Sequence, residues 1–314
     1  MTHQEFEFYD PHRLLSYNAH FNFIMDVRGR GKTFTFAKRI PIDAFLKSGE
    51  QFIYVRRYKE ELKDLDGFFT DIEHMYPEHE FKVKHRTFYI DNKVMGYAVN
   101  LSTANMKKSV AYPHVTRVVY DEFILEKGFI RYLPNEVKTF LNFYETVART
   151  RDNVKVYFLG NSISITNPYF LEFKIIPKQN QRFTSVDSYT NEQGVKEHLI
   201  LAELGQDDDS FREMKLNTRF GRIIANTEFA KMSVENQFED AHDSFIEKKH
   251  PKSVFMYSMT YMGQTYGIWS SKHTGKIYAS NKYSLSNGRN YVLTTEEHRP
   301  NMILIDNIKK HNNS

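Results

Sequence analysis

The sequence has no cysteine in 314 residues, and this absence excludes several classes of protein. Disulfide-stabilised folds, cysteine-ligated zinc and iron–sulfur sites and thiol catalysis all need that side chain. No apolar run is long enough to span a bilayer, and the N-terminal segment lacks the apolar core of a signal peptide. We therefore expect no membrane partner, and the composition is compatible with a reducing cytoplasm.

The sequence also lacks an excess of charge of one sign. Lys and Arg number 43 against 39 Asp and Glu, so the formal net charge is only +4. A polyanionic partner would have to be met by a local basic patch and not by bulk charge. Internal repeats and low-complexity segments are absent too, whereas aromatic residues are abundant at 15%. This composition is typical of a folded, multidomain chain.

The first two-thirds of the sequence alternates strand patterns with helical patterns. Short apolar runs predict strands at residues 20–26, 51–57, 115–123 and 153–161. Helical spacing lies between them, over residues 33–45, 60–75 and 135–147. The alternation predicts an α/β fold with a parallel sheet. Pro41 should kink or break the first helix, and residues 79–101 predict an inserted set of short strands around the turn Asp91-Asn92.

The character of the chain changes beyond residue 200. Residues 201–230 are polar and weakly periodic, and they predict a linker with short helices. Apolar runs after residue 231, separated at Gly263, Gly275 and Asn287-Gly288, predict a small α+β unit with antiparallel strands. We therefore expect three parts, at residues 1–200, 201–230 and 231–314.

The most informative motif is DVRGRGKT, at residues 26–33. It follows an apolar strand and precedes a helix, and its last three residues match the end of the phosphate-binding P-loop G-x-x-x-x-G-K-[ST]. Asp26 stands where the first glycine is usual. The predicted ATP-binding residues are Arg28, Gly29, Arg30, Gly31, Lys32 and Thr33. Backbone amides would bind phosphate, Lys32 would add charge, and the Thr33 hydroxyl would bind Mg²⁺. The alternative is an ordinary turn before a helix.

The second motif is VVYDE, residues 118–122, an apolar strand that ends in two carboxylates. Ligands of doubly wound sheets bind beyond the carboxyl ends of the strands, where these acids should lie. Asp121 would then hold Mg²⁺, and Glu122 would activate the attacking water. A strand ending in solvated acids is the alternative. Together, the two motifs predict NTP hydrolysis.

Asn161 ends the strand pattern over 153–161. In additional-strand P-loop ATPases this strand lies beside the phosphate-loop strand, so Asn161 would face the γ-phosphate and report its presence. The alternative is an asparagine in a strand-to-loop turn.

Four arginines compete for one catalytic role. Arg149 and Arg151 precede the amino end of the same strand, from which neither should reach its own nucleotide. Each is therefore either structural or an arginine finger that acts in trans on a neighbouring subunit, which implies a ring. Arg28 and Arg30 are the competing fingers in cis, and surface ion pairs are the remaining alternative.

Several long strings resemble those of one protein family. They include DVRGRGKT (26–33), EQFIYVRRYK (50–59), VVYDEF (118–123) and GNSISITNPYFL (160–171). On these strings the chain resembles the DNA-packaging ATPases of small phi29-like tailed bacteriophages, most densely over residues 9–175. The departures are Asp26 at the first P-loop glycine, Thr33 where a serine also occurs, and a tail after about residue 300 that is short for the family. The resemblance implies an ATP-hydrolysing ring motor, with five subunits expected, that drives double-stranded viral DNA into a preformed capsid.

The resemblance also assigns domains and roles. It implies an additional-strand (ASCE) motor domain, a linker domain and a C-terminal domain resembling a degenerate RNase H-like nuclease. The matching residues are Lys32 and Thr33 for Walker A, Asp121 and Glu122 for Walker B, Arg149 for the trans finger, and Arg56 and Lys59 for a basic segment between subunits that modulates Glu122. The implied partners are the capsid portal or connector and, as a further candidate, a scaffold RNA. The implied location is the host cytoplasm and, transiently, the procapsid portal vertex, but not the mature virion.

A translocating ring should grip DNA phosphates without reading bases. The basic side chains that flank the Walker B strand are candidates for this contact, namely Lys107, Lys108, Lys127 and Arg131. Solvated side chains are the alternative.

Nuclease activity is predicted to be absent. Two-metal cleavage needs several converging carboxylates, and Val254–Met262, the candidate first strand of the C-terminal unit, carries none. The rival enzyme is a terminase-like large subunit that also cleaves DNA. The other rivals are a nucleotide-binding scaffold and a monomeric P-loop phosphotransferase.

Overall fold

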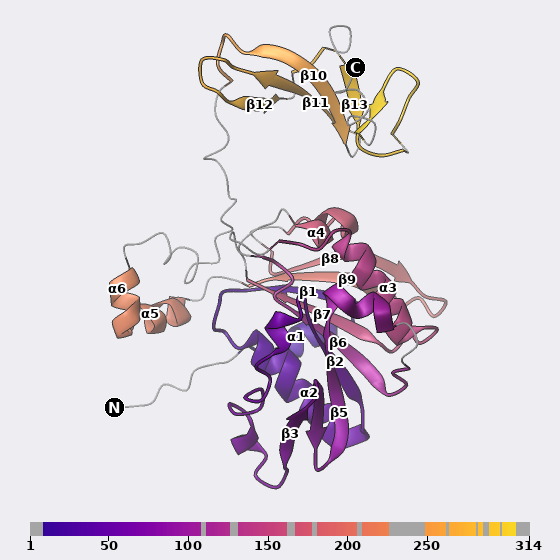
Figure 1. The fold of residues 1–314 in the computed structure, drawn as a ribbon, viewed down its shortest axis with the longest axis vertical. Helices are drawn as coiled ribbons and strands as arrows, with labels where there is room; N and C mark the ends of the chain where they lie inside the picture. Colours follow the sequence, from indigo (N-terminus) through magenta and orange to yellow (C-terminus); the bar gives the residue numbers. More distant parts are fainter. Residues whose placement is uncertain are drawn as a thin grey trace. The chain divides into compact units, whose positions relative to one another are not determined.

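The structure is a computed structural model. It describes residues 9–107, 111–125, 131–161, 167–177, 181–205, 209–225, 249–261, 264–280, 282–284, 289–295 and 297–305. The chain divides into two compact units, Met1–Ala241 and His242–Ser314, and each is described by itself (Figure 1).

A large, mostly parallel sheet forms the centre of the first unit. Within the described residues it has nine strands in the order β3-β4-β5-β2-β6-β7-β1-β9-β8. The strands are β1 Phe21–Met25, β2 Gln51–Arg56, β3 Phe81–Lys84, β4 Thr87–Ile90, β5 Lys93–Asn100, β6 Val115–Asp121, β7 Lys155–Gly160, β8 Phe183–Thr190 and β9 Lys196–Leu204. The run from β5 to β9 in this order is parallel, whereas β3, β4 and β8 are added antiparallel at the two edges.

Helices cover both faces of this sheet, because alternate strand residues point to opposite sides. Phe23 and Met25 of β1 belong to the buried cluster that includes helices α3 and α4, whereas Ile24 belongs to the cluster that includes α1, η1 and α2. The helical segments of this unit are α1 His12–Ser16, η1 Phe34–Arg39, α2 Ile40–Ser48, η2 Glu60–Leu62, η3 Glu73–Met75, η4 Leu101–Lys107, α3 Glu136–Ala148, α4 Pro168–Phe173, α5 Asp209–Asn217 and α6 Arg219–Ile224. The α/β prediction is confirmed for this unit.

The four predicted strands are all present, as β1, β2, β6 and β7. The inserted strands also form around Asp91 and Asn92, both of which have positive φ, and β5 extends the insertion into the main sheet beside β2. The helix does not end at Pro41. Instead its hydrogen bonding changes just before that residue, where the π-helix η1 ends and α2 begins.

The predicted helix over 60–75 is wrong. The segment forms turns with the two short 3₁₀ segments η2 and η3, and its hydrogen bonds join residues three apart, as from Phe68 N to Leu65 O and from Ile72 N to Phe69 O, both at 2.9 Å. Such turns bury every third residue or so, which imitates helical spacing. Asp66 and Gly67 favour the turns.

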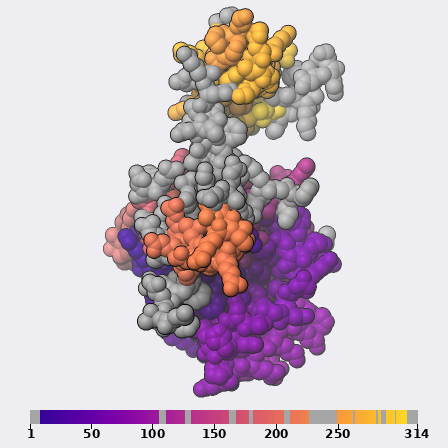
Figure 2. All heavy atoms as spheres, turned by 90° about the vertical axis from the view of Figure 1, so that its left-hand side faces the viewer, coloured from indigo at the N-terminus to yellow at the C-terminus, as the bar shows by residue number. Residues whose placement is uncertain are grey.

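The end of the first unit continues past residue 200. β9 stays in the main sheet to Leu204, and the short helices α5 and α6 follow within the predicted linker range. Figure 2 shows the orange atoms of these two helices gathered on the side of the first unit that faces the viewer. Among the described residues, no helix has the length and hydropathy needed to span a membrane.

The second unit is built on a smaller sheet. Its described strands are β10 Val254–Tyr261, β11 Gln264–Ser270, β12 Ile277–Ser280, β13 Arg289–Val292 and β14 Ile303–Leu304, in the order β12-β11-β10-β13-β14. The first three strands are antiparallel as predicted, but β13 is parallel to β10 and β14 is parallel to β13. The prediction of antiparallel strands throughout is therefore wrong, because the chain crosses from β12 to the far side of β10 and does not turn back as a hairpin.

Candidate nucleotide site

The loop over residues 26–33 leaves the carboxyl end of β1. Its positive φ angles occur at Gly29 (93°) and Gly31 (89°), which are the positions that need glycine. Asp26 does not have a positive φ, so a side chain is tolerated there. The buried Asp26 carboxylate accepts hydrogen bonds from Val27 N at 2.8 Å and Arg30 Nη1 at 3.4 Å. The residue that departs from the glycine pattern therefore braces the loop from within.

Lys32 lies in the interior of this loop. Its Nζ donates to the carbonyls of Asp26 and Val27, at 2.7 and 2.9 Å. Burial lowers the pKa of Lys32 to about 8, although Asp26 and Asp121 oppose the shift. A phosphate entering the loop would offer this ammonium group a stronger, charged acceptor than the two carbonyls.

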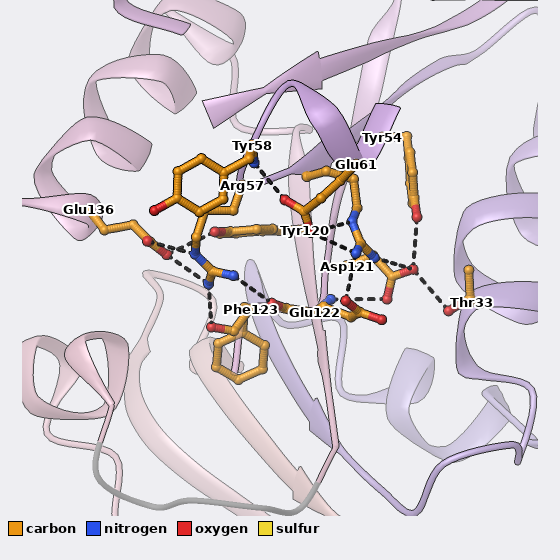
Figure 3. Close-up of polar contacts among 11 residues, drawn as sticks. Thr33, Tyr54, Arg57, Tyr58, Glu61, Tyr120, Asp121, Glu122, Phe123 and Glu136 are labelled. Carbon is orange, nitrogen blue, oxygen red and sulfur yellow. Dashed lines mark hydrogen bonds and ion pairs between the residues drawn. The ribbon is translucent and has the colours of Figure 1, made fainter. Parts of the chain in front are cut away.

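Thr33 and Asp121 meet at the carboxyl ends of β1 and β6 (Figure 3). Thr33 Oγ1 donates to Asp121 Oδ2 at 3.0 Å, and Tyr54 OH from β2 donates to the same oxygen at 2.9 Å. Burial raises the pKa of Asp121, and the nearby Arg56 opposes that shift. Burial and the Asp121 charge raise the pKa of Tyr54 well above its usual value, so its phenol stays a donor. Sequence reasoning missed Tyr54. A usable signal is a tyrosine near the carboxyl end of β2, the strand beside β6, because its hydroxyl group can reach the acids at the end of β6.

Glu122 follows Asp121 in a left-handed backbone conformation, with φ at 56°. Its side chain is half exposed, and its Oε2 accepts a 2.6 Å hydrogen bond from Arg56 Nη2. Arg56 also donates to Glu61 Oε1, through Nε at 3.2 Å and Nη2 at 2.7 Å. The two carboxylates therefore share one guanidinium, and Glu61 is a further member of the site that the motifs did not reveal.

A second arginine, Arg57, supports the same turn from beneath. It is only 1% exposed, and its guanidinium donates to the carbonyls of Glu122 and Phe123, at 3.1 and 2.8 Å. Its other donors form a forked pair with the buried carboxylate of Glu136, with Nε to Oε2 at 2.8 Å and Nη2 to Oε1 at 3.0 Å (Figure 3). Neither residue was predicted, although two adjacent arginines at a strand end should point to opposite faces of the sheet.

A cavity of about 440 Å³ lies between the loop and the acidic end of β6, and its volume is within the usual range for small-molecule sites. Its lining includes the predicted residues Arg28, Gly29, Gly31, Lys32, Thr33, Asp121, Glu122 and Asn161. Asp71, which the sequence did not single out, also lines it and forms a 2.6 Å ion pair with Lys38. Arg30 is not among the lining residues; its guanidinium lies near Asp26 and 5.6 Å from the ring of Phe211 in α5.

The groups present suit a nucleotide with Mg²⁺. The loop lines the cavity with Lys32, whose ammonium group would bind phosphate, and Thr33 and Asp121 offer the oxygen ligands that Mg²⁺ prefers. Among the described residues, no group of three or more His, Asp or Glu side chains is arranged to hold a metal by itself. A bound Mg²⁺ would therefore take its remaining ligands from phosphate and water, as is usual for this ion.

Arg149 and Arg151 lie at the opposite end of the sheet and differ in their surroundings. Arg151 donates to four carbonyls, at 2.6 to 3.0 Å, from Tyr112, Pro113, Val115 and Val147. Arg149 is exposed, has φ at 52°, and forms no hydrogen bond or ion pair through its side chain within the described part of the chain. The six residues of β7 separate it from its own cavity by about 20 Å, which is longer than any side chain.

Among the remaining predicted residues, the described Lys59 and Arg131 are not part of the lining of this cavity. Lys59 is exposed at the start of η2. The exposed Arg131 accepts a 2.8 Å hydrogen bond on its carbonyl from Tyr58 OH. Lys107 ends η4, whereas Lys108 and Lys127 lie outside the described residues.

Comparisons with known proteins agree with these features. Residues 4–313 match the family described as Podovirus DNA encapsidation protein (Gp16). The chain is 42% identical over 302 residues to the DNA packaging protein of Bacillus phage phi29, covering 96% of this chain and 87% of that protein.

Two solved phi29 structures are similar as well. The N-terminal domain of the phi29 DNA packaging ATPase matches with a TM-score of 0.57 at 44% identity, over 63% of this chain and 96% of that one. The phi29 viral genome packaging motor assembly matches with a TM-score of 0.64 at 39% identity, over 98% and 92%. The chain therefore belongs to the family of podovirus DNA encapsidation proteins, as the resemblance to phi29-like packaging ATPases indicated.

Proposed function

We propose that the chain is an ATP-hydrolysing motor that translocates double-stranded viral DNA into a preformed capsid, as a ring of identical subunits with five expected. The observation that carries this proposal is the contact between Thr33 and Asp121, which joins the glycine-lysine loop to the acidic end of β6. Similarity to the phi29 DNA packaging protein and packaging motor supports DNA as the substrate and its packaging as the process that ATP hydrolysis drives.

The strand order supports the additional-strand class of P-loop ATPases. β7 lies between the loop strand β1 and the acidic strand β6, which is where that class places its additional strand. In this account residues 1–200 supply most of the motor domain, which β9 carries to Leu204, and residues 201–230 supply the linker.

Phosphate binding is assigned to residues 28–33. Lys32 would exchange its two carbonyl partners for phosphate oxygens, and Thr33 and Asp121 would hold Mg²⁺. When bound, Mg²⁺ supplies positive charge that stabilises the phosphate oxygens during hydrolysis. Asn161, at the cavity wall, is assigned to sensing the γ-phosphate.

Glu122 is the proposed general base. Its carboxylate has to leave the Arg56 guanidinium before it can accept a proton from water, because an engaged carboxylate is a weaker base. The Arg56 contact supports a role for this residue in controlling Glu122. The same role is proposed for the exposed Lys59 on the resemblance alone, and contact with a neighbouring subunit in this segment would set when the acid is released.

Arg149 is the proposed finger in trans. It is exposed and too far from its own cavity, whereas Arg151 is fully used in holding its own subunit together. Arg28 lines the cavity and remains the competitor in cis; Arg30 is turned toward Asp26 and Phe211.

The proposed partners follow from this role. Double-stranded DNA would be gripped through the candidate residues Lys107, Lys108, Lys127 and Arg131. The chain would dock on the capsid portal or connector, with a scaffold RNA as a further candidate, at the procapsid vertex in the host cytoplasm.

The second unit is proposed to be a degenerate RNase H-like domain without nuclease activity. Its strand order, with the fourth and fifth strands parallel to the first, is that of RNase H-like sheets and supports the resemblance. The central strands β10 and β13 carry no acid, and the buried Ser258 hydroxyl on β10 donates to Asn290 on β13 instead.

The test is ATP turnover with and without linear double-stranded DNA, for the wild-type chain and Glu122→Gln. The proposal predicts stimulation by DNA in the wild type and a loss of about 10² to 10³-fold or more in the variant, since the base is removed. Equal turnover in the two chains would overturn it. Nicking of a plasmid in Mn²⁺, retained when Glu122→Gln abolishes ATP turnover, would favour the terminase-like alternative.

A further inference from the structure

The carboxylate of Glu136 is an unusually crowded acceptor at the start of α3. Besides the fork from Arg57, it accepts hydrogen bonds from Tyr120 OH at 2.8 Å, Tyr169 OH at 3.2 Å and Leu133 N at 2.8 Å. Glu136 is 2% exposed and Arg57 1%. A buried ion pair is weak evidence for stability by itself, because desolvation offsets most of the attraction. The pair is therefore better explained by the two parts that it joins, the Glu122 turn and the start of α3.

One end of the pair holds the turn that carries the proposed base. Arg57 donates to the carbonyls of Glu122 and Phe123, and Glu122 has the left-handed φ that most residues avoid. Such a conformation persists when its surroundings over-determine it. The Arg57 guanidinium is one such surrounding group, because it binds the two carbonyls that this turn presents.

The other end of the pair holds helix α3. Glu136 is its first residue, and the 13 residues of α3 span about 20 Å to Arg149, which directly follows the helix. Val137, Phe140, Phe143 and Val147 bury one face of α3 in the core. The far end is fastened again by Arg151, which binds Tyr112 O and Val115 O where the chain enters β6. Helix α3 is therefore tied to β6 at both ends.

We propose that Arg57 and Glu136 are positioning residues that lock the Glu122 turn to helix α3, so that the base of one subunit and the Arg149 which that subunit offers to its neighbour move as one rigid piece. This proposal rests on the roles of Glu122 and Arg149 given above. Under this proposal, a side-chain pair inside each subunit couples successive sites of the ring. When the nucleotide bound to one subunit changes, the Glu122 turn moves, and the Arg149 that reaches the next site moves with it.

The first test is hydrogen exchange of the 145–152 amides with and without a non-hydrolysable ATP analogue, in the wild type, Glu136→Gln and the control Glu172→Gln. Glu136→Gln keeps the shape of the side chain and removes its charge, and Glu172 is an exposed glutamate on α4. At equal occupancy, the analogue should change exchange at 145–152 in the wild type and the control, but by less than half as much in Glu136→Gln. An undiminished change in Glu136→Gln, or none in the wild type, would overturn the proposal. A wild-type chain that binds no nucleotide would instead contradict the proposed function.

The second test separates the finger from the cis site by mixing subunits. In the mixture, Glu122→Gln subunits supply Arg149 to the sites of Arg149→Ala subunits. A second substitution, Glu136→Gln, in the Glu122→Gln chain then affects only the Arg149 that this chain donates, because its own site already lacks the base. We expect turnover of the mixture to fall about tenfold or more, since a misplacement of about 1 Å costs up to about 10²-fold, whereas nucleotide affinity of the added variant stays within about twofold. Unchanged turnover would overturn the proposal. If Glu136→Gln folds poorly, Arg57→Lys provides a second variant. It keeps the charge but loses the forked pair with Glu136, and it should lower turnover of the mixture in the same way.

Discussion

Arg56 Nη2 lies 2.6 Å from Glu122 Oε2, so an arginine at the end of β2 occupies the carboxylate that the proposed mechanism needs free. The same guanidinium is held by Glu61, and Arg57, the next residue, holds the backbone of the same turn from the other face of the sheet. The ends of β2 and β6 are thus joined by two adjacent arginines with different tasks, one on the side chain of Glu122 and one on its carbonyl.

Arg56→Gln is expected to raise ATP turnover measured without DNA. A partly exposed ion pair such as Arg56–Glu122 is worth about 0.2–1 kcal/mol, so its loss should increase the population of free Glu122 by up to about fivefold. Stimulation by DNA should shrink by a similar factor. Turnover is measured at saturating ATP, with Lys63→Gln, an exposed change in the same region, as the control. A DNA-free rate that falls below that of the wild type would contradict the control role of Arg56.

Asp26→Gly, which restores the usual P-loop glycine, is expected to weaken the loop and not to improve it. The backbone at residue 26 does not need a positive φ, so glycine gains nothing there and costs about 0.5–1 kcal/mol in conformational entropy. Loss of the hydrogen bond to Val27 N adds about 1 kcal/mol. We expect nucleotide affinity to fall about three- to thirtyfold by titration calorimetry, and less in Asp26→Asn, which keeps an acceptor. Tighter binding by Asp26→Gly would refute this account of the loop.

Arg149→Ala and Arg151→Ala are expected to fail in opposite ways. Arg149 is exposed, so its removal should change the free energy of unfolding by less than about 0.5 kcal/mol while turnover falls about 10³-fold or more. Arg151→Ala removes four hydrogen bonds to carbonyls, of which Tyr112 O keeps a bond from Val115 N, and should destabilise the first unit by about 2–4 kcal/mol. Unfolding should be measured by circular dichroism and not by tryptophan fluorescence, because the one tryptophan, Trp269, lies in the second unit. Equal stability of the two variants would contradict the distinction.

His20 should make the first unit less stable in mild acid. Burial lowers the pKa of His20, whose Nε2 contacts Tyr144 OH at 2.5 Å. The unfolded chain therefore binds a proton more readily than the folded one, and stability is full above about pH 6.5 and decreases as pH falls through that value. In His20→Gln, unfolding by urea should depend less on pH between about 5 and 7. The exposed His12 provides the control variant, and an unchanged slope in His20→Gln would exclude this origin.

The sequence predicted the parts of the fold that depend on local pattern. Strands β1, β2, β6 and β7 are short apolar runs. Their buried residues alternate between the two core clusters on opposite faces of the sheet, as expected for strands that are covered on both sides. Residues 60–75 show where this fails, because 3₁₀ turns bury Leu65, Phe68 and Ile72 at nearly helical spacing. The direction of β13 was also out of reach, since a strand pattern does not tell which neighbour a strand will find.

The site was predicted in the same uneven way. Lys32, Thr33, Asp121 and Glu122 stand in motifs and lie together around the cavity. Tyr54, Arg57 and Glu136 have no motif, because each acts through a partner that is 65 to 79 residues away in the chain, as in the Arg57–Glu136 pair. Such residues become visible only when the sheet brings β2, β6 and the start of α3 together.

Each site is proposed to be completed by the neighbouring subunit, and the measurement that decides this claim mixes two inactive chains. Glu122→Gln lacks the base but keeps the finger, whereas Arg149→Ala keeps the base but lacks the finger. We predict that each chain alone is nearly inactive and that an equimolar mixture regains ATP turnover which rises with protein concentration and with linear double-stranded DNA. A mixture that is no more active than the two chains measured separately would contradict the claim and move the finger to Arg28 in cis.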